Sequence, residues 1–361
     1  MSENHAIPVL DARDLESPSG DLLRELARGF GEFGLVYISH HGIDQDELDA
    51  LYRGFRSFLR RPRVEKEAFG RDDIWFQRGW TPPNTEKAVI AEGRPDFKEC
   101  WFAIVEKPDS RLQLEYPELF ADNLWPEDGD DFREPYLSVG KSLQDLGLRF
   151  LAAAAQALDL PIDTFAKIVK GGAHVTRALE YQPLDDEAIA SEILWGEEHT
   201  DFNLITLLPG GRFYNPADEL SPRPEDGSGL HLRTRSNEEH PQGRMVPGTP
   251  PAGCLVLQVG QELEILTGGL FQATPHVVTA PKAAGWSRVS VAHFVHVHPH
   301  HVLFPLEEFC NENTVQRYRP PVLAGTYAMK TMVDIGLAPP ETLSAFGYRH
   351  YDRLASVRSQ S

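Results

Sequence analysis

Hydrophobic residues recur at helical spacing in two stretches near the start of the chain. Leucines and phenylalanines repeat every three or four residues between Ser19 and Phe33, and a similar stripe follows Asp44. Ser19 and Asp44 are residue types that commonly cap the first turn of a helix. The short apolar run at residues 35–38 lies between the two stretches. The pattern therefore predicts a helix, a strand and a second helix, with both apolar stripes packed into the core.

The pattern changes from helical to strand-like in the second half of the chain. Residues 132–158 form the longest stretch with helical spacing. From Val175 onward, short segments rich in β-branched residues alternate with turn residues. The strands that we predict there span residues 176–181, 205–208, 230–233, 253–259, 276–280 and 288–296. Strands at such spacing are typical of a sandwich or jelly roll, so the predicted fold class is mainly β with flanking helices.

Composition and charge limit the classes of partner. The chain has 361 residues, of which 41% are hydrophobic and 25% charged, which is ample for one large core or two domains. Its formal net charge of −19 argues against nucleic acid or an anionic membrane surface as a partner. An anionic small molecule stays possible, because a local arginine and a bound dication can reverse the local field. We expect a small-molecule substrate and a monomer or homodimer.

Cysteine usage and the N-terminal sequence bear on localisation. The three cysteines, Cys100, Cys254 and Cys310, are widely spaced and form no CxxC motif. Residues 1–10 do not resemble a signal peptide, and no apolar stretch of about 18 residues occurs. The sequence therefore predicts a soluble protein of the reducing cytoplasm.

A candidate metal site begins at His199 and Asp201. The segment 198–208 ends in an apolar run without proline and predicts a buried strand, which would place both side chains on one face. His276, in another predicted strand, is the best candidate for a third ligand. Two histidines and one carboxylate, with the remaining coordination positions open, are typical of non-haem Fe(II) that activates oxygen. For His199 alone, a strand histidine with a satisfied hydrogen bond is an equally good interpretation.

A second signal follows in the predicted strand at residues 286–295. Alternation places Arg288 and Ser290 on one face of this strand, and His296 shares that face. A buried arginine is costly unless it is paired, and a guanidinium beside a hydroxyl suits an incoming carboxylate. Together with the metal ligands, the pair predicts a site for an acid that also contacts iron. The histidines at positions 293, 296, 298, 300 and 301 indicate either a second metal site or, as we favour, a strand exit with partly solvated histidines.

These motifs resemble, in order, the 2-oxoglutarate and Fe(II)-dependent oxygenases, in the branch that includes isopenicillin N synthase. The matching segments are residues 7–11, 34–43, 78–83, 96–101, 199–202, 266–269, 274–278 and 288–290. The resemblance implies a double-stranded β-helix, a jelly-roll and cupin-like core. It implies one oxygenase domain over residues 1–361, with an N-terminal helical and strand region (1–100), a core with the metal site (175–306) and a C-terminal helical tail (307–361).

The resemblance also implies roles for single residues. It makes His199, Asp201 and His276 the Fe(II) ligands and the catalytic residues. Three residues would hold the distal carboxylate of the cosubstrate 2-oxoglutarate: Arg288, Ser290 and Tyr181. The implied activity uses O₂ to oxidise an unactivated C–H bond of a small molecule in natural-product or amino-acid metabolism, by hydroxylation, with desaturation or cyclisation as further outcomes of the same chemistry. Further candidates for substrate contact are Trp80, Asn203, Phe294 and His296, and simple packing is equally open for Trp80.

The chain departs from the family pattern in two places. The spacing between His199 and His276 is longer than usual, because residues 209–251 contain an insertion rich in glycine, proline and charge. We expect its part at 213–227 to be a loop that forms a lid or an oligomer contact. Leu179 also stands where the family often has an asparagine.

Three alternative functions stay open. An oxidase related to isopenicillin N synthase would keep the Arg-x-Ser pair and use O₂ without 2-oxoglutarate. A zinc hydrolase also uses a His/His/carboxylate set, but it leaves Arg288 and Ser290 without a role. A non-catalytic jelly-roll binding module would not need an intact metal triad. The sequence does not identify the primary substrate.

Overall fold

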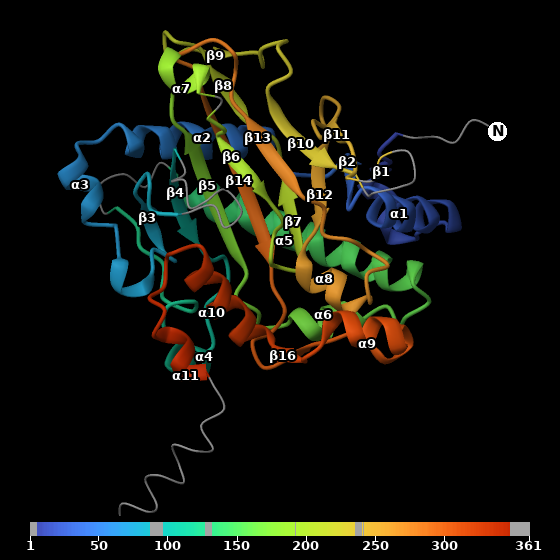
Figure 1. The fold of residues 1–361 in the computed structure, drawn as a ribbon. Coiled ribbons are helices and arrows are strands. Elements are labelled where there is room, and N and C mark those ends of the chain that lie inside the picture. The colour runs from blue at the N-terminus through green and yellow to red at the C-terminus, as the bar shows by residue number, and fades with distance from the viewer. Residues whose placement is uncertain are drawn as a thin grey trace, which may run out of the picture.

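The computed structural model of this protein describes residues 6–86, 97–126, 132–191, 193–234, 240 and 242–346. Strands occupy its centre, and helices surround them (Figure 1). The largest sheet has ten strands: β1 (Val9–Asp11), β2 (Leu35–Ser39), β3 (Gly79–Thr81), β4 (Lys98–Ala103), β5 (Val175–Tyr181), β7 (Ile205–Leu208), β8 (Arg212–Tyr214), β9 (Leu220–Ser221), β12 (Leu255–Val259) and β14 (Ser287–Val295). A four-stranded sheet contains β6 (Gly196–His199), β10 (Gly229–Arg233), β11 (Met245–Pro247) and β13 (His276–Thr279).

The order of strands within each sheet is far from their order in the chain. The large sheet runs β1-β2-β12-β7-β14-β5-β4-β3, with β8 beside β14, and the smaller one runs β11-β10-β13-β6. Neighbouring strands therefore come from distant parts of the sequence, as in a jelly roll. A small third pair joins β15 (Val302–Leu303) to β16 (Val322–Leu323). The predicted fold class, a mainly β jelly-roll core with flanking helices, is confirmed.

The helices begin and end close to where the hydrophobic pattern places them. Helix α1 (Gly20–Glu32) follows Ser19, whose hydroxyl accepts a hydrogen bond from the backbone N–H of Leu22. Helix α2 (Gln45–Leu59) follows Asp44, whose carboxylate accepts from two backbone N–H groups. The long α5 (Arg133–Ala157) packs against α1 and α2 on one side and against β7 and β14 on the other. Both caps and the long helix are confirmed.

The remaining helices are short. They are α3 (Arg63–Glu67), α4 (Ser110–Glu115), α6 (Thr164–Val169), α7 (Asp186–Ala190), α8 (Gln261–Leu266), α9 (Glu312–Tyr318), α10 (Ala324–Asp334) and α11 (Thr342–Phe346), with single 3₁₀ turns η1 (Ala12–Glu16), η2 (Asp72–Ile74) and η3 (Glu307–Phe309). The C-terminal helices α10 and α11 lie together at the lower end of the sheet (Figure 1). Residues 347–361 of the expected helical tail, and residues 87–96 of the expected N-terminal region, lie outside the described residues. None of the helices described has the length and apolar character needed to cross a bilayer.

The single strand predicted for residues 198–208 is wrong. Strand β6 ends at His199 in the smaller sheet, and β7 begins at Ile205 in the large sheet, so residues 200–204 cross between the two sheets. The backbone carbonyls of Asp201 and Asn203 accept hydrogen bonds from the N–H groups of the first turn of α8. These carbonyls are therefore satisfied without a strand partner, which is why the chain can leave one sheet and enter the other.

The prediction that residues 213–227 form a loop is also wrong in part. Residues 212–214 and 220–221 form the hairpin β8–β9, and β8 extends the large sheet by pairing with β14. Phe213 of β8 is buried. The hairpin is part of the sheet and not a lid, while an oligomer contact there stays a prediction. Within the rest of the insertion, residues 235–239 and 241 lie outside the described residues.

A buried ion network ties α2 to β5 and to the β8–β9 hairpin. Arg56 lies 2.8 Å from Glu180 and 2.5 Å from Asp218, and Arg60 lies 3.3 Å and 2.9 Å from the same two carboxylates. Arg56 and Glu180 are buried, whereas the side chain of Asp218 is 56% exposed. Removing one partner of a buried pair leaves an uncompensated charge, which costs far more than losing an exposed partner.

We therefore expect Glu180→Ala to lower the free energy of unfolding by roughly 3–5 kcal/mol. The matched variant Asp218→Asn removes an exposed carboxylate from the same network and is expected to cost less than about 1 kcal/mol. Urea unfolding followed by tryptophan fluorescence measures both. Equal effects of the two substitutions would contradict the buried-network explanation.

Candidate metal and cosubstrate site

The three predicted metal ligands come together where the chain leaves the smaller sheet and crosses to the large one. His199 ends β6 and His276 begins β13, and the two residues are paired in the register of these strands. Asp201 lies on the crossing segment just after β6. Each imidazole Nε2 is 3.8 Å from Asp201 Oδ1, and the three ligand atoms all lie within 4.8 Å of one another. The spacing suits a single ion in contact with all three.

Neighbouring groups orient each ligand. His199 Nδ1 lies 2.7 Å from the carbonyl oxygen of Glu197, and His276 Nδ1 lies 3.3 Å from that of Thr274 and 2.8 Å from the side-chain amide of Gln258. Because a carbonyl oxygen only accepts, His199 Nδ1 carries the proton, which leaves its Nε2 lone pair directed at Asp201. His276 Nδ1 carries the proton when the Gln258 amide turns its oxygen, which is buried and has no hydrogen-bond partner among the described residues in the present orientation, toward the ring. Thr206 Oγ1 donates a 2.6 Å hydrogen bond to Asp201 Oδ2. This bond leaves Oδ1 facing the imidazoles.

At His199 and Asp201 the electrostatics favour the protonation states that a metal requires. Burial, together with the neighbouring His276, lowers the pKa of His199 to about 4, so this imidazole is neutral at pH 7. Burial alone would raise the pKa of Asp201, but the two imidazoles and the Thr206 hydroxyl lower it below its usual value. A metal binds histidine as the neutral imidazole, so two histidine ligands and one carboxylate form a net monoanionic set that attracts a dication. Fe(II) fits this set, as does Zn²⁺ by ligand type alone.

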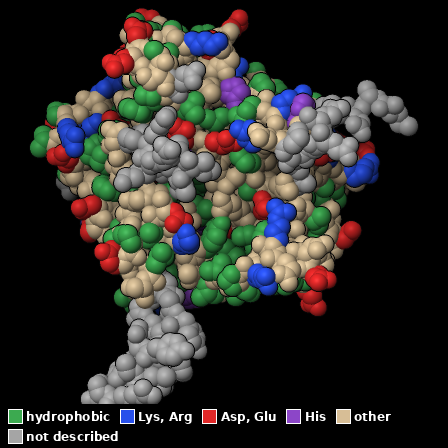
Figure 2. Space-filling model, viewed as in Figure 1, with side chains coloured by type: hydrophobic (Ala, Val, Ile, Leu, Met, Phe, Trp, Pro, Cys, Tyr) green, Lys and Arg blue, Asp and Glu red, His purple; other side chains and the backbone are tan. Residues whose placement is uncertain are grey.

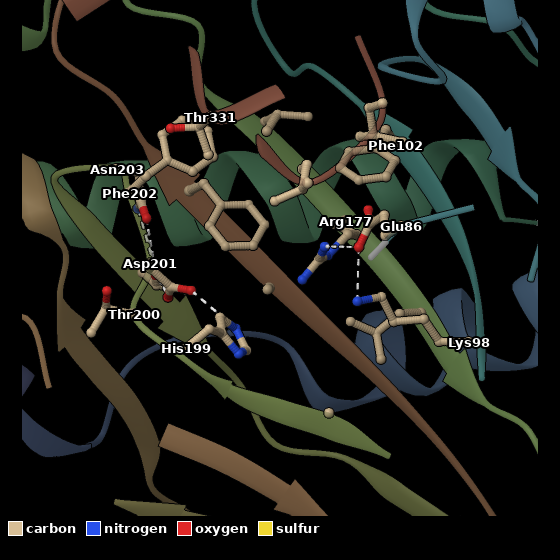
Figure 3. A pocket seen from close by; sticks show the side chains of 18 of the residues that line it. Glu86, Lys98, Phe102, Arg177, His199, Thr200, Asp201, Phe202, Asn203 and Thr331 are labelled. Carbon is tan, nitrogen blue, oxygen red and sulfur yellow. Dashed lines mark hydrogen bonds and ion pairs between the residues drawn. The ribbon is translucent and has the colours of Figure 1, made fainter. Parts of the chain in front are cut away.

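The triad opens into a cavity of about 520 Å³, which is large enough for a small organic ligand. Its walls come from both sheets, which shows that it lies between them. In Figure 3, His199 and Asp201 lie on one side of this space, and Lys98, Glu86 and Arg177 lie across from them.

Arg288 and Ser290 lie at one end of this cavity, as predicted for one face of β14. Arg288 Nη1 donates a 3.3 Å hydrogen bond to Ser290 Oγ. Gly211 lies so close that a Cβ atom there would be 2.6 Å from Arg288 Nε, so the guanidinium rests against bare backbone. Burial lowers the pKa of Arg288, and within the described part of the chain no carboxylate forms an ion pair with it. A buried cation that lacks an internal counterion is suited to an anionic ligand.

Tyr181 lies at the same end of the cavity. It is paired with Arg288 in the register of β5 and β14, and its ring centroid is 5.7 Å from the guanidinium carbon. The ring also stacks on Trp195, with centroids 5.5 Å apart. Arg288, Ser290 and Tyr181 are therefore brought together, and all three line the cavity.

The four substrate candidates fall into two groups. Phe294 and His296 line the cavity, and the rings of His296 and Phe202 lie 5.1 Å apart. The structure corrects the prediction that Trp80 contacts the substrate: its side chain is 1% exposed, and its indole N–H donates to Glu99 in the core. Asn203 also lines the cavity, although its side chain is buried and its amide donates to the Ile205 carbonyl and to Thr206. A substrate contact at Asn203 therefore stays a prediction.

The histidines near the end of β14 are more buried than expected. His293 is completely buried and lies 2.9 Å from the hydroxyl of Thr176, and His296 is also buried. The expectation of partly solvated side chains is therefore wrong for these two, because β14 stays inside the sheet up to Val295. His300 is half exposed and pairs with Glu115 at 2.6 Å. Among the described residues, the group able to hold a metal is His199, Asp201 and His276.

Several residues of the site were missed in the sequence. Gln258 contacts His276, Thr206 bonds to Asp201, and Gly211 lies against Arg288. No local sequence motif identifies these three residues. Arg177 was within reach of the strand argument, because alternation places it on the same face of β5 as Tyr181. Glu86 carried no signal, since only folding brings it to the cavity.

Comparison with known proteins agrees with this geometry. Residues 7–128 match the family "non-haem dioxygenase in morphine synthesis N-terminal", and residues 174–297 match the "2OG-Fe(II) oxygenase superfamily". The 2-oxoglutarate-dependent dioxygenase ecdK of Aspergillus rugulosus is 27% identical over 319 residues, which cover 81% of this chain and 87% of that protein. Homoarginine-6-hydroxylase of Oryza sativa subsp. japonica is 28% identical over 335 residues, which cover 87% and 92%.

Solved structures share the whole architecture. A putative 2OG-Fe(II) oxygenase family protein from Caulobacter crescentus superposes with a TM-score of 0.74 at 26% identity, covering 91% of this chain and 99% of that one. A full-length protein from Neurospora crassa in complex with alpha-KG superposes with a TM-score of 0.72 at 21% identity, covering 92% and 98%. The chain has a jelly-roll core and a His-Asp-His cluster, and it matches the two family descriptions in its N-terminal and C-terminal parts. It therefore belongs to the 2OG-Fe(II) oxygenase superfamily and is an Fe(II)- and 2-oxoglutarate-dependent dioxygenase that uses O₂.

Proposed function

We propose that His199, Asp201 and His276 hold the Fe(II) of this dioxygenase and that Arg288, Ser290 and Tyr181 hold the distal carboxylate of 2-oxoglutarate. One observation carries the proposal: the only metal-capable cluster of the described residues and a buried arginine without an internal counterion open into the same cavity. A five-carbon diacid has one end suited to each of these two features. The Caulobacter and Neurospora structures support the same general arrangement through their fold.

The residues of the chain have distinct tasks in this proposal. Bound Fe(II) supplies the oxidising chemistry. Thr206 holds Asp201 with Oδ1 toward the two imidazoles, and Gln258 holds the ring of His276. Arg288 and Ser290 orient the cosubstrate by its far end, which fixes where its other end lies. The apolar part of the cavity wall, which includes Phe102, excludes water from the substrate.

The proposed reaction is oxidation of an unactivated C–H bond of a small molecule. Hydroxylation converts substrate, 2-oxoglutarate and O₂ into hydroxylated substrate, succinate and CO₂. Relatives named as a homoarginine-6-hydroxylase and a codeine O-demethylase support a substrate from amino-acid or natural-product metabolism. Desaturation or cyclisation of the substrate uses the same site and is distinguished by the product formed.

Other features of the chain extend the proposal beyond the site. We infer one oxygenase domain over residues 1–361, with an N-terminal region (1–100), a core (175–306) and a C-terminal tail (307–361). We also infer a cytoplasmic protein, because Cys100, Cys254 and Cys310 are all free thiols, and we propose that it is a monomer or homodimer. Charged side chains of both signs are scattered over the face in Figure 2, which supports the absence of a nucleic-acid or membrane partner.

The test is a succinate-release screen with protein loaded anaerobically with Fe(II). We expect succinate to form only when iron, 2-oxoglutarate and O₂ are all present, and to increase when a library compound is a substrate. Product mass then identifies the oxidation, with a gain of one oxygen for hydroxylation. Substrate oxidation that consumes O₂ without 2-oxoglutarate, or hydrolysis supported by Zn²⁺, would contradict the proposal.

A further inference from the structure

The structure places a second cationic group in the cavity, away from Arg288. Arg177 shares the cavity face of β5 with Leu179 and Tyr181. In the register of β5 and β14, Tyr181 is opposite Arg288, whereas Arg177 is opposite Ala292. Four residues along a strand span roughly 13 Å. Arg177 and Arg288 are therefore at different ends of the cavity and do not serve the same carboxylate.

The internal partners of Arg177 leave much of its hydrogen-bonding capacity unused. Its Nη1 lies 3.5 Å from Glu86 Oε2, an oxygen that Lys98 Nζ already contacts at 2.8 Å. Figure 3 shows these three side chains gathered at the cavity wall. A guanidinium has five N–H donors, and among the described residues Arg177 Nε has no acceptor at all. Two cations thus share one carboxylate.

Arg177 is a buried cation whose donors are only partly used. Burial opposes the charge on Arg177, but the carboxylates of Glu86 and Asp201 raise its pKa, so it stays cationic. A buried N–H group without an acceptor is costly, and an anionic ligand that accepts a hydrogen bond from Arg177 removes that cost.

Other charged groups on the cavity wall do not supply this anion. Lys330 pairs with Asp334 at 2.5 Å and both are at least one-third exposed. Arg78 is buried and donates to three backbone carbonyls. Glu197 also lines the cavity, but the carboxylates that act on Arg177 are Glu86 and Asp201.

The surroundings of Arg177 describe the rest of the ligand. Its guanidinium lies over two aromatic rings, at 5.6 Å from the centroid of Phe102 and 5.2 Å from that of Phe294. Further apolar residues line the same cavity: Leu119, Ala173, Val175, Phe202, Ile335 and Leu337. A ligand that contacts both the Arg177 guanidinium and these apolar side chains has an anionic group and an apolar body.

We propose that Arg177, supported by Lys98 and Glu86, binds a carboxylate of the primary substrate, and that the substrate is a small carboxylic acid with an apolar body. The inference rests on the proposed function, because it assumes that Fe(II) and 2-oxoglutarate occupy the rest of the cavity. The carboxylate of 2-oxoglutarate nearer the metal is a second source of the same chemistry, and the experiment separates the two.

The experiment uses a panel of aryl- and alkyl-carboxylic acids, each paired with its primary amide. Calorimetry on the anaerobic Fe(II)–2-oxoglutarate protein measures binding, and succinate release measures turnover. Acids of the panel are expected to bind at least tenfold more tightly than their amides. Arg177→Met is expected to weaken binding of the best acid roughly 10- to 100-fold, the loss of a charge-assisted hydrogen bond, while the KM for 2-oxoglutarate changes less than twofold.

Matched variants separate this role from a structural one. Arg177→Lys keeps the charge and is expected to retain part of the preference for acids, and Lys330→Met removes another cavity cation and is expected to have no effect on it. Iron content and the melting temperature show whether each variant is folded. The proposal is overturned if no acid binds, if amides bind equally well, or if Arg177→Met raises the KM for 2-oxoglutarate instead. Acid binding measured by calorimetry without any succinate release would refute the proposed function alone.

Discussion

Asp201→Ala is expected to abolish stoichiometric Fe(II) binding and with it all 2-oxoglutarate turnover, while leaving a folded protein. Asp201 is the only carboxylate of the ligand cluster, and its Oδ1 lies 3.8 Å from each imidazole Nε2. Without it, two neutral imidazoles remain, which hold a hard dication poorly. Iron content after anaerobic reconstitution and succinate release measure the two effects, and thermal unfolding checks the fold.

The matched controls are Thr206→Val and Gln258→Leu. These residues hold Asp201 and His276 in orientation without being ligands themselves. Loss of such a supporting hydrogen bond typically costs about 10- to 100-fold in metal affinity, so both variants are expected to bind iron weakly but measurably. If the Asp201 variant keeps its iron and its activity, the ligand assignment is wrong.

Arg288→Ala is expected to raise the KM for 2-oxoglutarate by roughly 30-fold or more, because truncating one partner of a buried charge pair costs about 2–5 kcal/mol. Arg288→Lys is expected to recover only part of this loss, since an ammonium group lacks the planar fork that matches a carboxylate. Calorimetric titration of 2-oxoglutarate into the iron-loaded protein measures the affinity directly. Iron content is expected to stay unchanged, because Arg288 contacts none of the three ligands.

A control for Arg288 lies close by. Arg223 contributes to the electrostatic environment of Arg288 but bonds to the Ser228 carbonyl and to Thr249, outside the cavity lining. Arg223→Ala is expected to change the 2-oxoglutarate affinity less than threefold, in line with a surface charge. An Arg288→Ala enzyme with unaltered dependence on 2-oxoglutarate would instead favour an oxidase that uses O₂ alone.

The sequence was sufficient wherever the evidence was local. Ser19 and Asp44 cap their helices through hydrogen bonds to residues two or three positions away, so a short window contains both partners. Strand alternation likewise placed Arg288 and Ser290 on one face of β14. The resemblance to a family then connected His276 to a pair of residues far from it in the chain, which spacing alone cannot do.

Local evidence failed where a long-range contact decided the outcome. The apolar run that ends segment 198–208 predicted a single strand, but N–H groups in the first turn of α8 donate to the carbonyls of Asp201 and Asn203, and the chain changes sheets there. Trp80 was predicted to contact the substrate, yet its indole N–H donates to the carboxylate of Glu99 in the core. In both cases the deciding partner comes from another element of the fold, so no local window includes it.

The sequence by itself determined the capped helices, the His199 and Asp201 pair and the Arg-x-Ser pair, because each depends on residue type and short spacing. Only the tertiary structure decided which side chains share the cavity. The pairing of β4, β5 and β14 places Lys98 and Arg177 on one wall, and the fold brings Glu86 to both. The physical reason is that strand register and sheet crossing are set by the packing of the whole core, and they decide which charged groups meet in the cavity.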